Sequence, residues 1–490
     1  MIGRKGKDTV IKNIARYSSS NIYRQFLALF TAFIRPKLLT PELYGLWNIL
    51  NLIPRYSSYI HLGSRSSIRY LIPYYESKNE IQKINEIKGS VFYGSLYLNL
   101  LLVSGFVILS LKASLNLEVR LGLIAMAAIV IMGWYYDYYI SILKSHQNFT
   151  LITSSNYLKA SIMAVLSIIL IYFFKIYGVY LTAVLTLIVI ILYLRSNHPL
   201  EPHSKFCFKV FKDLVKMGFP IMTINIITLL ISTSDRFIVS YFLGYKQLGY
   251  YSIAIMVLHF LENIPAVARE VIEPRLMQSL SENSSEKNLN KYFLKPLINT
   301  AYYMPFLVGL VIFVFPVLIP IILPRYIPGI PPTIILVIGG YFLFMSYTAR
   351  GIIVANNLQL KASVVMAFVL LINITLSISF VKSGMGIKGV ALGSSISYFI
   401  LFISLLYFVK KKCSYDLQDW KINMMGLCWP FPIMCAAIVI LKSVSEVMHI
   451  NDYMAAFMNL FVYCMIMFIV VNIAGKKYIL LKMIRLKELW

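Results

Sequence analysis

Long apolar stretches follow one another along almost the whole chain, separated by short polar segments. An α-helix needs about 20 predominantly apolar residues to cross the hydrocarbon core of a bilayer, and each stretch reaches that length. Transmembrane β-strands would alternate polar and apolar positions over about ten residues, a pattern that this sequence lacks. The pattern predicts an all-α, polytopic membrane protein of about 14 helices. The expected spans are 17–38, 42–62, 89–111, 119–142, 151–174, 178–194, 217–242, 247–272, 297–323, 331–354, 361–381, 387–409, 424–442 and 453–474.

Composition and charge support a membrane protein. Hydrophobic residues make up 59% of the 490 positions and charged residues only 13%, whereas soluble domains carry about 25% charged residues. The net charge of +26 would also suit a nucleic-acid partner. However, most Lys and Arg residues fall in alternate connections, such as 63–88, 195–216 and 410–421. This positive-inside asymmetry predicts that both termini are cytoplasmic. Membrane lipid headgroups are a sufficient partner for these charges, so we expect no nucleic acid.

The cysteines and the N-terminus add two expectations. The five cysteines form no CxxC pair, so we expect no disulfide framework, no metal site and no cofactor. The opening "MIGRKGKDTVIKNIARYSSS" is basic but lacks a short apolar core that ends in a small-residue cleavage site. We therefore expect the first helix to be an uncleaved anchor.

Two weak internal matches predict a repeat. "TPELYGLWNI" (40–49) aligns with "GYKQLGYYSI" (244–253), and "YGVYLTAVLT" (177–186) aligns with "KGVALGSSIS" (388–397). The matches occur in the same order and at similar offsets, which favours two six-helix lobes related as parallel repeats. The expected divisions are an N-lobe at 1–194, a cytoplasmic linker at 195–216, a C-lobe at 217–409, and two further helices with a basic cytoplasmic tail at 410–490.

Polar residues at helical spacing mark the first two spans of each expected lobe. Such a stripe inside a membrane bundle faces water or a polar partner, so we expect a wet cavity between the lobes. The stripe residues that we expect to line it are Asn21, Asn48, Asn51, Asn225, Ser232 and His259.

Isolated cations within spans suggest what such a cavity could bind. Arg24 and Arg55 have no acidic neighbour in their own helices, and Lys159 lies within the fifth span. A guanidinium group presents a planar fork that suits phosphate, so a cavity lined by such groups favours an anionic substrate such as a diphosphate.

Acidic residues within spans are fewer. Asp235 and Arg236 interrupt the seventh span, and neighbours in sequence point about 100° apart on a helix, so their partners are expected on other helices. These two residues, together with Glu262 and Asp137, are candidates for ion coupling or for interhelical pairing.

A longer pattern connects the repeat to a known family. It consists of Gly218, Pro220, Asp235, Arg236, Leu243, Gly244, Leu248, Gly249 and Tyr251, with a first-lobe counterpart at Arg35, Leu38, Leu39, Pro41, Tyr44, Gly45 and Trp47. It resembles the polysaccharide-exporter flippases of the multidrug/oligosaccharidyl-lipid/polysaccharide (MATE-like) exporter superfamily, over residues 10–410.

This resemblance implies a V-shaped pair of six-helix bundles that work by alternating access. It also implies transport of an undecaprenyl-diphosphate-linked oligosaccharide across the bacterial inner membrane, for O-antigen, capsule or exopolysaccharide. A polysaccharide polymerase and a chain-length regulator are the partners that would follow from such a role. Arg24, Arg55 and Arg269 resemble, in placement, the cavity arginines of the related flippases of the peptidoglycan precursor.

Three other functions stay open. The first is a cation-coupled multidrug exporter, although that branch carries acids in its first-lobe helices, and spans 1 and 2 contain none. The second is a membrane-embedded polysaccharide polymerase or glycosyltransferase, which the absence of a large extramembrane segment or a catalytic motif disfavours. The third is a scaffold without transport.

Overall fold

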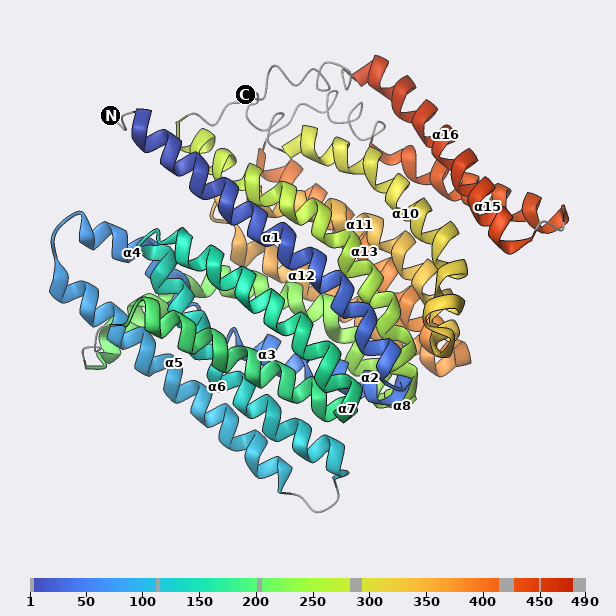
Figure 1. Ribbon diagram of the computed structural model, residues 1–490. Coiled ribbons are helices and arrows are strands. Elements are labelled where there is room, and N and C mark those ends of the chain that lie inside the picture. Colours follow the sequence, from blue (N-terminus) through green and yellow to red (C-terminus); the bar gives the residue numbers. More distant parts are fainter. Residues whose placement is uncertain are drawn as a thin grey trace. The chain divides into compact units, whose positions relative to one another are not determined.

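The computed structural model describes residues 4–111, 115–200, 205–282, 293–413, 427–448 and 451–478. Within these ranges the side chains of 4–15, 17–18, 69, 266–282, 355, 412–413 and 473–478 are not described. Every regular element in the described ranges is a helix (Figure 1), which confirms the predicted all-α fold.

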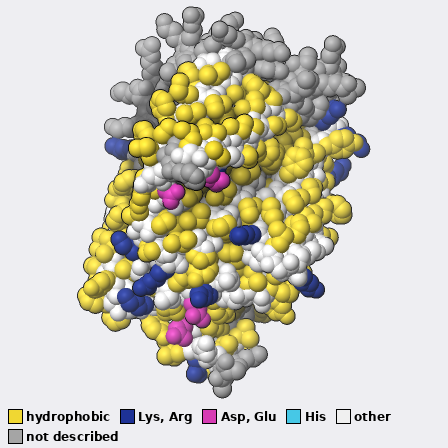
Figure 2. Space-filling view, turned by 90° about the vertical axis from the view of Figure 1, so that its right-hand side faces the viewer, with side chains coloured by type: hydrophobic (Ala, Val, Ile, Leu, Met, Phe, Trp, Pro, Cys, Tyr) yellow, Lys and Arg dark blue, Asp and Glu magenta, His cyan; other side chains and the backbone are white. Residues whose placement is uncertain are grey.

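Nine segments of the described chain are long and apolar enough to cross a membrane. Three of them contain a break in the backbone, at Lys175, at Gly244 and at Gly384–Gly386. The chain is therefore a multi-pass membrane protein, while a total of about 14 crossings stays a prediction. The face of the molecule shown in Figure 2 is covered mainly by hydrophobic side chains, as expected for a surface that contacts acyl chains.

The chain divides into two compact units, residues 1–229 and 230–490. Unit 1 contains α1 (Arg4–Leu38), α2 (Pro41–Leu50), α3 (Leu52–Ser57), α4 (Ser64–Glu76), α5 (Ile81–Ser110), α6 (Leu117–Ser145) and α7 (Phe149–Asn197). α8 (Phe208–Glu282) begins in unit 1 and continues into unit 2. Unit 2 also contains α10 (Lys295–Ile322), the 3-10 helix η2 (Pro324–Gly329), α11 (Ile330–Ala355), α12 (Gln359–Phe380), the π-helical turn η3 (Val381–Met385), α13 (Gly386–Cys413), α15 (Pro430–Val447) and α16 (Asp452–Tyr478).

In unit 1, α7 packs against both α1 and α6, and α6 packs against α5 (Figure 1). The first turns of α8 also belong to this unit. Ser67 donates a hydrogen bond to the carbonyl of Leu214 at 3.0 Å, and the backbones of Gly63 and Gly218 touch. The first turns of α8 therefore pack within unit 1, and the lobe and linker bounds expected from the sequence stay a prediction.

In unit 2, α13 packs against α11 and α12, and α10 contacts α11 and α16. Tyr463 of α16 donates to the carbonyl of Pro305 at 2.7 Å, and its ring lies where a side chain at Gly309 would be. α16 is thus joined to α10 by a buried aromatic side chain.

The predicted repeat has a counterpart in the backbone. The break in α7 lies at Lys175, with φ 52° and ψ −123°, and the chain turns into α13 at Gly386, with φ 56° and ψ −138°. These two positions correspond when 177–186 is aligned with 388–397. The two units therefore use the same unusual turn at the same point of the repeat.

The first-lobe motif forms the joint between α1 and α2. Arg35 lies over the Trp47 ring at 5.5 Å from its centroid. Thr40 caps α2 by accepting a bond from the amide of Leu43 at 3.4 Å, and Pro41 occupies the first turn, where its missing N–H costs nothing. The motif residues thus have a structural role at this joint.

Candidate functional site

A polar pocket of about 360 Å³ lies within unit 1. It is bounded by α3, the start of α4, and the middle parts of α5, α6 and α7. Its lining residues are Asn51, Pro54, Arg55, Ser57, Ser58, Ile60, His61, Arg65, Asn99, Ile129, Val130, Gly133, Trp134, Tyr136, Asp137, Lys159, Met163, Ala183, Thr186 and Leu187.

The short helix α3 forms one wall because the second predicted span stops early. Ser57 and Ser58 donate to the carbonyls of Pro54 and Arg55, at 3.0 and 2.7 Å. Such local bonds compete with the helical ladder, and the regular helix ends at Ser57, before residue 62, where the apolar pattern ends.

The structure places the residues of the predicted polar stripe of this span in two different surroundings. Asn51 and Arg55 line the pocket. Asn48 instead donates to the carbonyl of Tyr44 in its own helix, at 2.8 Å. This bond satisfies the amide N–H locally, so Asn48 has a structural role.

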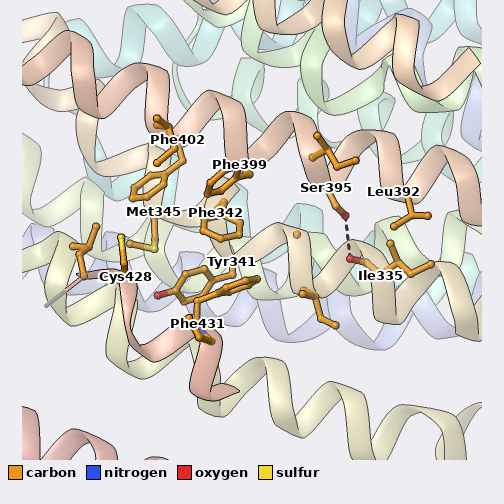
Figure 3. A pocket seen from close by; sticks show the side chains of 16 residues that line it. Ile335, Tyr341, Phe342, Met345, Leu392, Ser395, Phe399, Phe402, Cys428 and Phe431 are labelled. Carbon is orange, nitrogen blue, oxygen red and sulfur yellow. Dashed lines mark hydrogen bonds between the residues drawn. The ribbon is translucent and has the colours of Figure 1, made fainter. Parts of the chain in front are cut away.

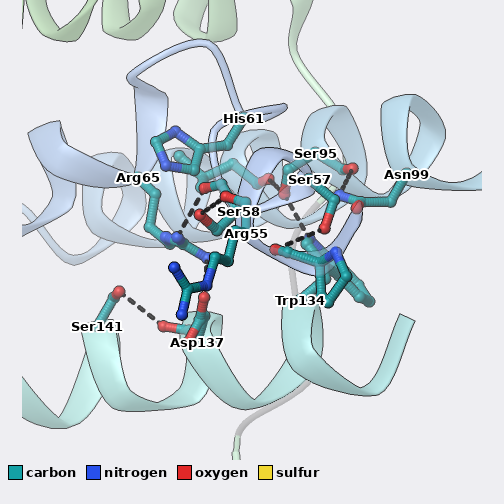
Figure 4. Close-up of polar contacts among 12 residues, drawn as sticks. Arg55, Ser57, Ser58, His61, Arg65, Ser95, Asn99, Trp134, Asp137 and Ser141 are labelled. Atoms are coloured by element: carbon teal, nitrogen blue, oxygen red, sulfur yellow. Dashed lines mark hydrogen bonds and ion pairs between the residues drawn. The ribbon is translucent and has the colours of Figure 1, made fainter. Parts of the chain in front are cut away.

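Three cations and one carboxylate line the pocket: Arg55, Arg65, Lys159 and Asp137. Arg65 forms an ion pair with Asp137 at 3.2 Å and also donates to the carbonyl of Ser58 at 3.1 Å. Figure 4 shows Arg55 and Arg65 on the same side of the pocket, near Asp137. Asp137 therefore balances part of the positive charge, and the lining keeps a formal excess of cations.

The sequence interpretation missed Arg65 because it lies in the polar connection after the second span. The signal that could have found it is the turn "SSYIHLGSR", whose hydroxyls and glycine allow the chain to return toward α3. Gly63 in this turn has φ 90°, a conformation that glycine adopts without strain.

Lys159 enters the pocket from α7. Its Nζ lies 3.8 Å from the centroid of the Tyr136 ring. A cation over an aromatic face gains about 0.5–2 kcal/mol, the larger value when water is excluded. The ring of Tyr136 therefore helps to keep an ammonium group inside the membrane-spanning part of unit 1.

Arg24 does not line this pocket. Its side chain is exposed on α1, close to the contacts that join α1 to α7. Those contacts are Tyr23 with Ser161 at 2.8 Å and Asn156 with Ser20 at 3.4 Å. Arg24 thus lies near the level of Lys159 along the neighbouring helix. Asn21, on the same helix, is half-buried, and among the described residues its Oδ1 has no hydrogen-bond partner.

The remaining candidates belong to α8. Asn225 and Ser232 are half-buried. The side chain of Arg269 lies outside the described part of the chain. Asp235 and Arg236 are both buried, with 2% of each residue exposed.

The partners of this pair come from beyond the Gly244 break, where φ is 83° and ψ is 175°. Tyr251 donates to Asp235 at 2.9 Å, and the backbone N–H of Arg236 donates to the same carboxylate at 2.7 Å. Arg236 contacts His259 at 3.0 Å, and Glu262 accepts a bond from Tyr347 at 2.6 Å. Asp235, Arg236, His259 and Glu262 are therefore brought together within unit 2.

A larger cavity of about 710 Å³ lies in unit 2 between α11, α13 and the chain that leads into α15. Figure 3 shows its aromatic walls, in which Phe342 lies 4.5 Å from Phe431 and 4.8 Å from Phe399 between ring centroids. Among the described residues its lining includes hydroxyl groups, such as those of Tyr341 and Ser395, but no charged side chain. The pocket of unit 1, which is lined by cations, is therefore the better candidate for an anionic ligand.

Comparison with known proteins identifies the family. The profile of the family described as polysaccharide biosynthesis protein matches residues 10–280, which is more than half of the chain. A Shigella flexneri protein whose name describes it as an O-antigen transporter is 24% identical over 268 residues, which cover 52% of this chain and 64% of that protein. The match thus spans less than two thirds of that relative. A membrane protein of Methanocaldococcus jannaschii is 24% identical over 409 residues, covering 75% of this chain and 77% of the relative.

Solved structures show the same fold at low identity. The lipid II flippase MurJ, in an inward closed conformation, superposes with a TM-score of 0.68 and 18% identity, over 94% of this chain and 99% of that one. An inward-facing multidrug resistance MATE family transporter of the MOP superfamily gives 0.63 and 15%, over 82% and 98%. The chain therefore belongs to the polysaccharide biosynthesis protein family and has the fold of the multidrug/oligosaccharidyl-lipid/polysaccharide exporter superfamily.

Proposed function

We propose that this protein is a flippase that moves a polyprenyl-diphosphate-linked oligosaccharide repeat unit across the bacterial inner membrane by alternating access. In this proposal the pocket of unit 1 receives the diphosphate head. The first sugar enters the pocket with it, and the remaining sugars and the polyprenyl chain stay outside. The observation that carries the proposal is the pocket lining, which has three cations and one carboxylate in a membrane protein of a polysaccharide biosynthesis family.

The size of the pocket supports a headgroup rather than a whole repeat unit. Pockets for drug-sized ligands measure about 300–1,000 Å³, and this pocket, at about 360 Å³, is near the lower end. A diphosphate with its first sugar fits that volume, whereas an oligosaccharide does not. Sugar identity would then be read mainly elsewhere.

The charges favour a dianion. Arg55 and Arg65 offer planar donor pairs, and Lys159 adds a point charge. All three cations line the pocket and can engage a diphosphate, and Arg65 also pairs with Asp137 at 3.2 Å. Exposed Arg24 lies near the level of Lys159 and would attract the head toward the pocket.

One further group suits the first sugar. Asn99 lines the pocket and uses its Nδ2 to donate to the carbonyl of Ser95 at 2.8 Å. Among the described residues its Oδ1 has no hydrogen-bond partner. An amide oxygen accepts a bond from a hydroxyl but repels a phosphate oxygen, so we assign Asn99 to the sugar side.

Complementation tests this proposal. In a strain that lacks its own copy of the gene, Arg55→Ala and Lys159→Ala should each reduce surface polymer at least tenfold. The reason is that a charged hydrogen bond is worth about 1.5–3 kcal/mol, and about 1.4 kcal/mol corresponds to a factor of ten. Immunoblots of the membrane fraction check that each variant is inserted and abundant.

Arg120→Ala is the matched control because Arg120 is exposed on α6 and is not among the pocket residues. It changes the net charge equally and should leave polymer unchanged. Wild-type polymer in both pocket variants would contradict the proposal.

A multidrug exporter is the second candidate, because a MATE transporter shares the fold. The excess of cations in the unit 1 pocket would repel the cationic drugs that such exporters remove. Drug susceptibility of the deletion strain separates the two functions. Increased sensitivity with unchanged polymer would favour the exporter.

A further inference from the structure

Four side chains of unit 2 form a hydrogen-bonded chain that the proposed headgroup site does not use. Arg236 Nη2 lies 3.0 Å from His259 Nε2, and His259 Nδ1 lies 2.8 Å from Glu262 Oε2. Tyr347 Oη completes the chain by donating to Glu262 Oε1 at 2.6 Å. Both ring nitrogens of one histidine thus contact side chains of opposite charge.

The hydrogen-bonding chemistry of Arg236 and Glu262 determines which ring nitrogen of His259 carries the proton. A guanidinium group only donates, so His259 Nε2 must accept from Arg236 and carries no proton. The single imidazole proton then lies on Nδ1 and is donated to the Glu262 carboxylate. The arrangement therefore holds a neutral histidine in its Nδ1–H form between a cation and an anion.

This arrangement has no position for one more proton on His259. A second imidazole proton would sit on Nε2 and point at the Arg236 donor. Two cations would then face each other across 3.0 Å, and the contact would break. The bond from Nδ1 to Glu262 would at the same time become an ion pair, which strengthens it.

The side chains of this hydrogen-bonded chain differ in their exposure. Arg236 is 2% exposed, whereas the side chains of His259 and Glu262 are 36% and 28% exposed. The histidine and the glutamate are thus only partly covered by the described residues, while the arginine is buried. Among the described residues Arg236 Nε has no hydrogen-bond partner, so the contact with His259 does much to hold the guanidinium group in place.

We propose that His259 is a proton-binding site that works as a switch in unit 2. In the state seen here, neutral His259 joins Arg236 to Glu262. Binding of one proton at Nε2 releases Arg236 and leaves His259 paired with Glu262. If the protein transports as proposed above, on which this step rests, the switch couples transport to protons rather than to sodium.

Other titratable groups surround this switch. Asp235 and Tyr251 lie on α8, with the Tyr251 hydroxyl bonded to Asp235 at 2.9 Å. Tyr347, which bonds to Glu262, comes from α11, which also carries Arg350 three residues further on, and the buried Tyr398 comes from α13. The Asp235 carboxylate is adjacent to Arg236 in sequence, so a released guanidinium group would keep a buried counter-charge.

Solid-state ¹⁵N NMR tests the proposal without any transport assay. The full-length chain is labelled with ¹⁵N-histidine and embedded in lipid bilayers. The sequence has only six histidines, so comparison with His259→Gln assigns the signal. Spectra are recorded at about pH 8 and about pH 5, on either side of the ordinary histidine value near 6.5.

At the higher pH we expect His259 in the Nδ1–H form, the less common form of free neutral histidine. At the lower pH we expect imidazolium. Arg236→Met removes the donor that faces Nε2, whereas Glu262 still accepts from Nδ1–H, so imidazolium should make up a larger share of the His259 signal in this variant than in wild type at the same pH.

His146→Gln is the matched control. His146 Nδ1 contacts Glu76 at 2.7 Å, which is the same pairing with a glutamate, and the variant should leave the His259 signal unchanged. An Nε2–H form of His259 at the higher pH, or no change between the two pH values, would overturn the proposal. The NMR result is independent of the complementation test. If the NMR result is as expected, the switch is supported whatever the transport assay shows. Wild-type polymer in Arg55→Ala would contradict the headgroup site and not the switch.

Discussion

Lys175 has a backbone conformation that a lysine adopts only at a cost. Its φ of 52° and ψ of −123° lie in a region that glycine occupies readily and other residues avoid. Such a conformation costs about 1–3 kcal/mol. The side chain is exposed, and the equivalent position of the repeat is Gly386, with φ 56°. The same backbone turn thus occurs at both aligned positions, once with glycine and once with lysine.

Lys175→Gly should raise the thermal stability of the purified protein. The substitution removes the strain but gives back some entropy to the unfolded chain, so we expect a net gain of about 1 kcal/mol. The change in Tm in detergent or nanodiscs measures it. Lys175→Ala is the control, because alanine keeps the strain. An equal or greater gain for alanine would show that the side chain, and not the backbone, is responsible.

The residues of the unit 1 pocket show what one sequence can and cannot predict. Arg55 and Lys159 stand out because a cation within an apolar span needs a reason to be there. Their shared pocket depends on contacts between α3, α6 and α7, which no single span contains. Arg65 and Tyr136 escaped prediction because an arginine in a polar connection and a tyrosine in a membrane helix are both common.

Helix breaks decide how the polar residues of each unit come together. The Gly244 break brings Tyr251 and His259 back to Asp235 and Arg236. The turn before α4 brings Arg65 back to α3, and it passes so close to α8 that Gly63 and Gly218 touch through their backbones. Apolar periodicity predicts the arms of such hairpins but not how closely they approach.

The two glycines should respond differently to alanine. A Cβ at Gly63 would collide with the backbone of Gly218, in addition to the strain of φ 90°, whereas a Cβ at Gly244 would meet open space. Gly244→Ala should therefore cost only the backbone strain, about 1–3 kcal/mol, and Gly63→Ala, which adds a collision with backbone atoms, should cost more. Thermal unfolding of both variants in the same detergent checks the order. A smaller loss at Gly63 would mean that the contact with α8 adjusts freely.

The regular helix of the second predicted span ends earlier than the apolar pattern predicts. Residues 58–62 are apolar enough to continue a helix, yet the chain turns there. Serine hydroxyls bonded to nearby carbonyls and a glycine with positive φ outweigh the hydrophobic pattern locally. Pro54, Ser57 and Ser58 carry that signal in the sequence, but it competes with a strong apolar average.

For the whole molecule, the apolar pattern was sufficient to predict the all-α membrane fold. The weak repeat matches also found real counterparts, since the turns at Lys175 and Gly386 share their backbone angles. The compact units are residues 1–229 and 230–490, and the first turns of α8 pack within unit 1. The linker at 195–216 stays a prediction.

The central claim is that the unit 1 pocket binds the diphosphate head of a lipid-linked sugar. Binding of undecaprenyl diphosphate to the purified protein, measured by native mass spectrometry, tests it most directly. We predict that Arg55→Ala and Lys159→Ala each weaken binding at least tenfold, because about 1.5 kcal/mol or more of charged hydrogen bonding is lost, while Arg120→Ala binds as wild type does. Equal binding by all four proteins would contradict the account.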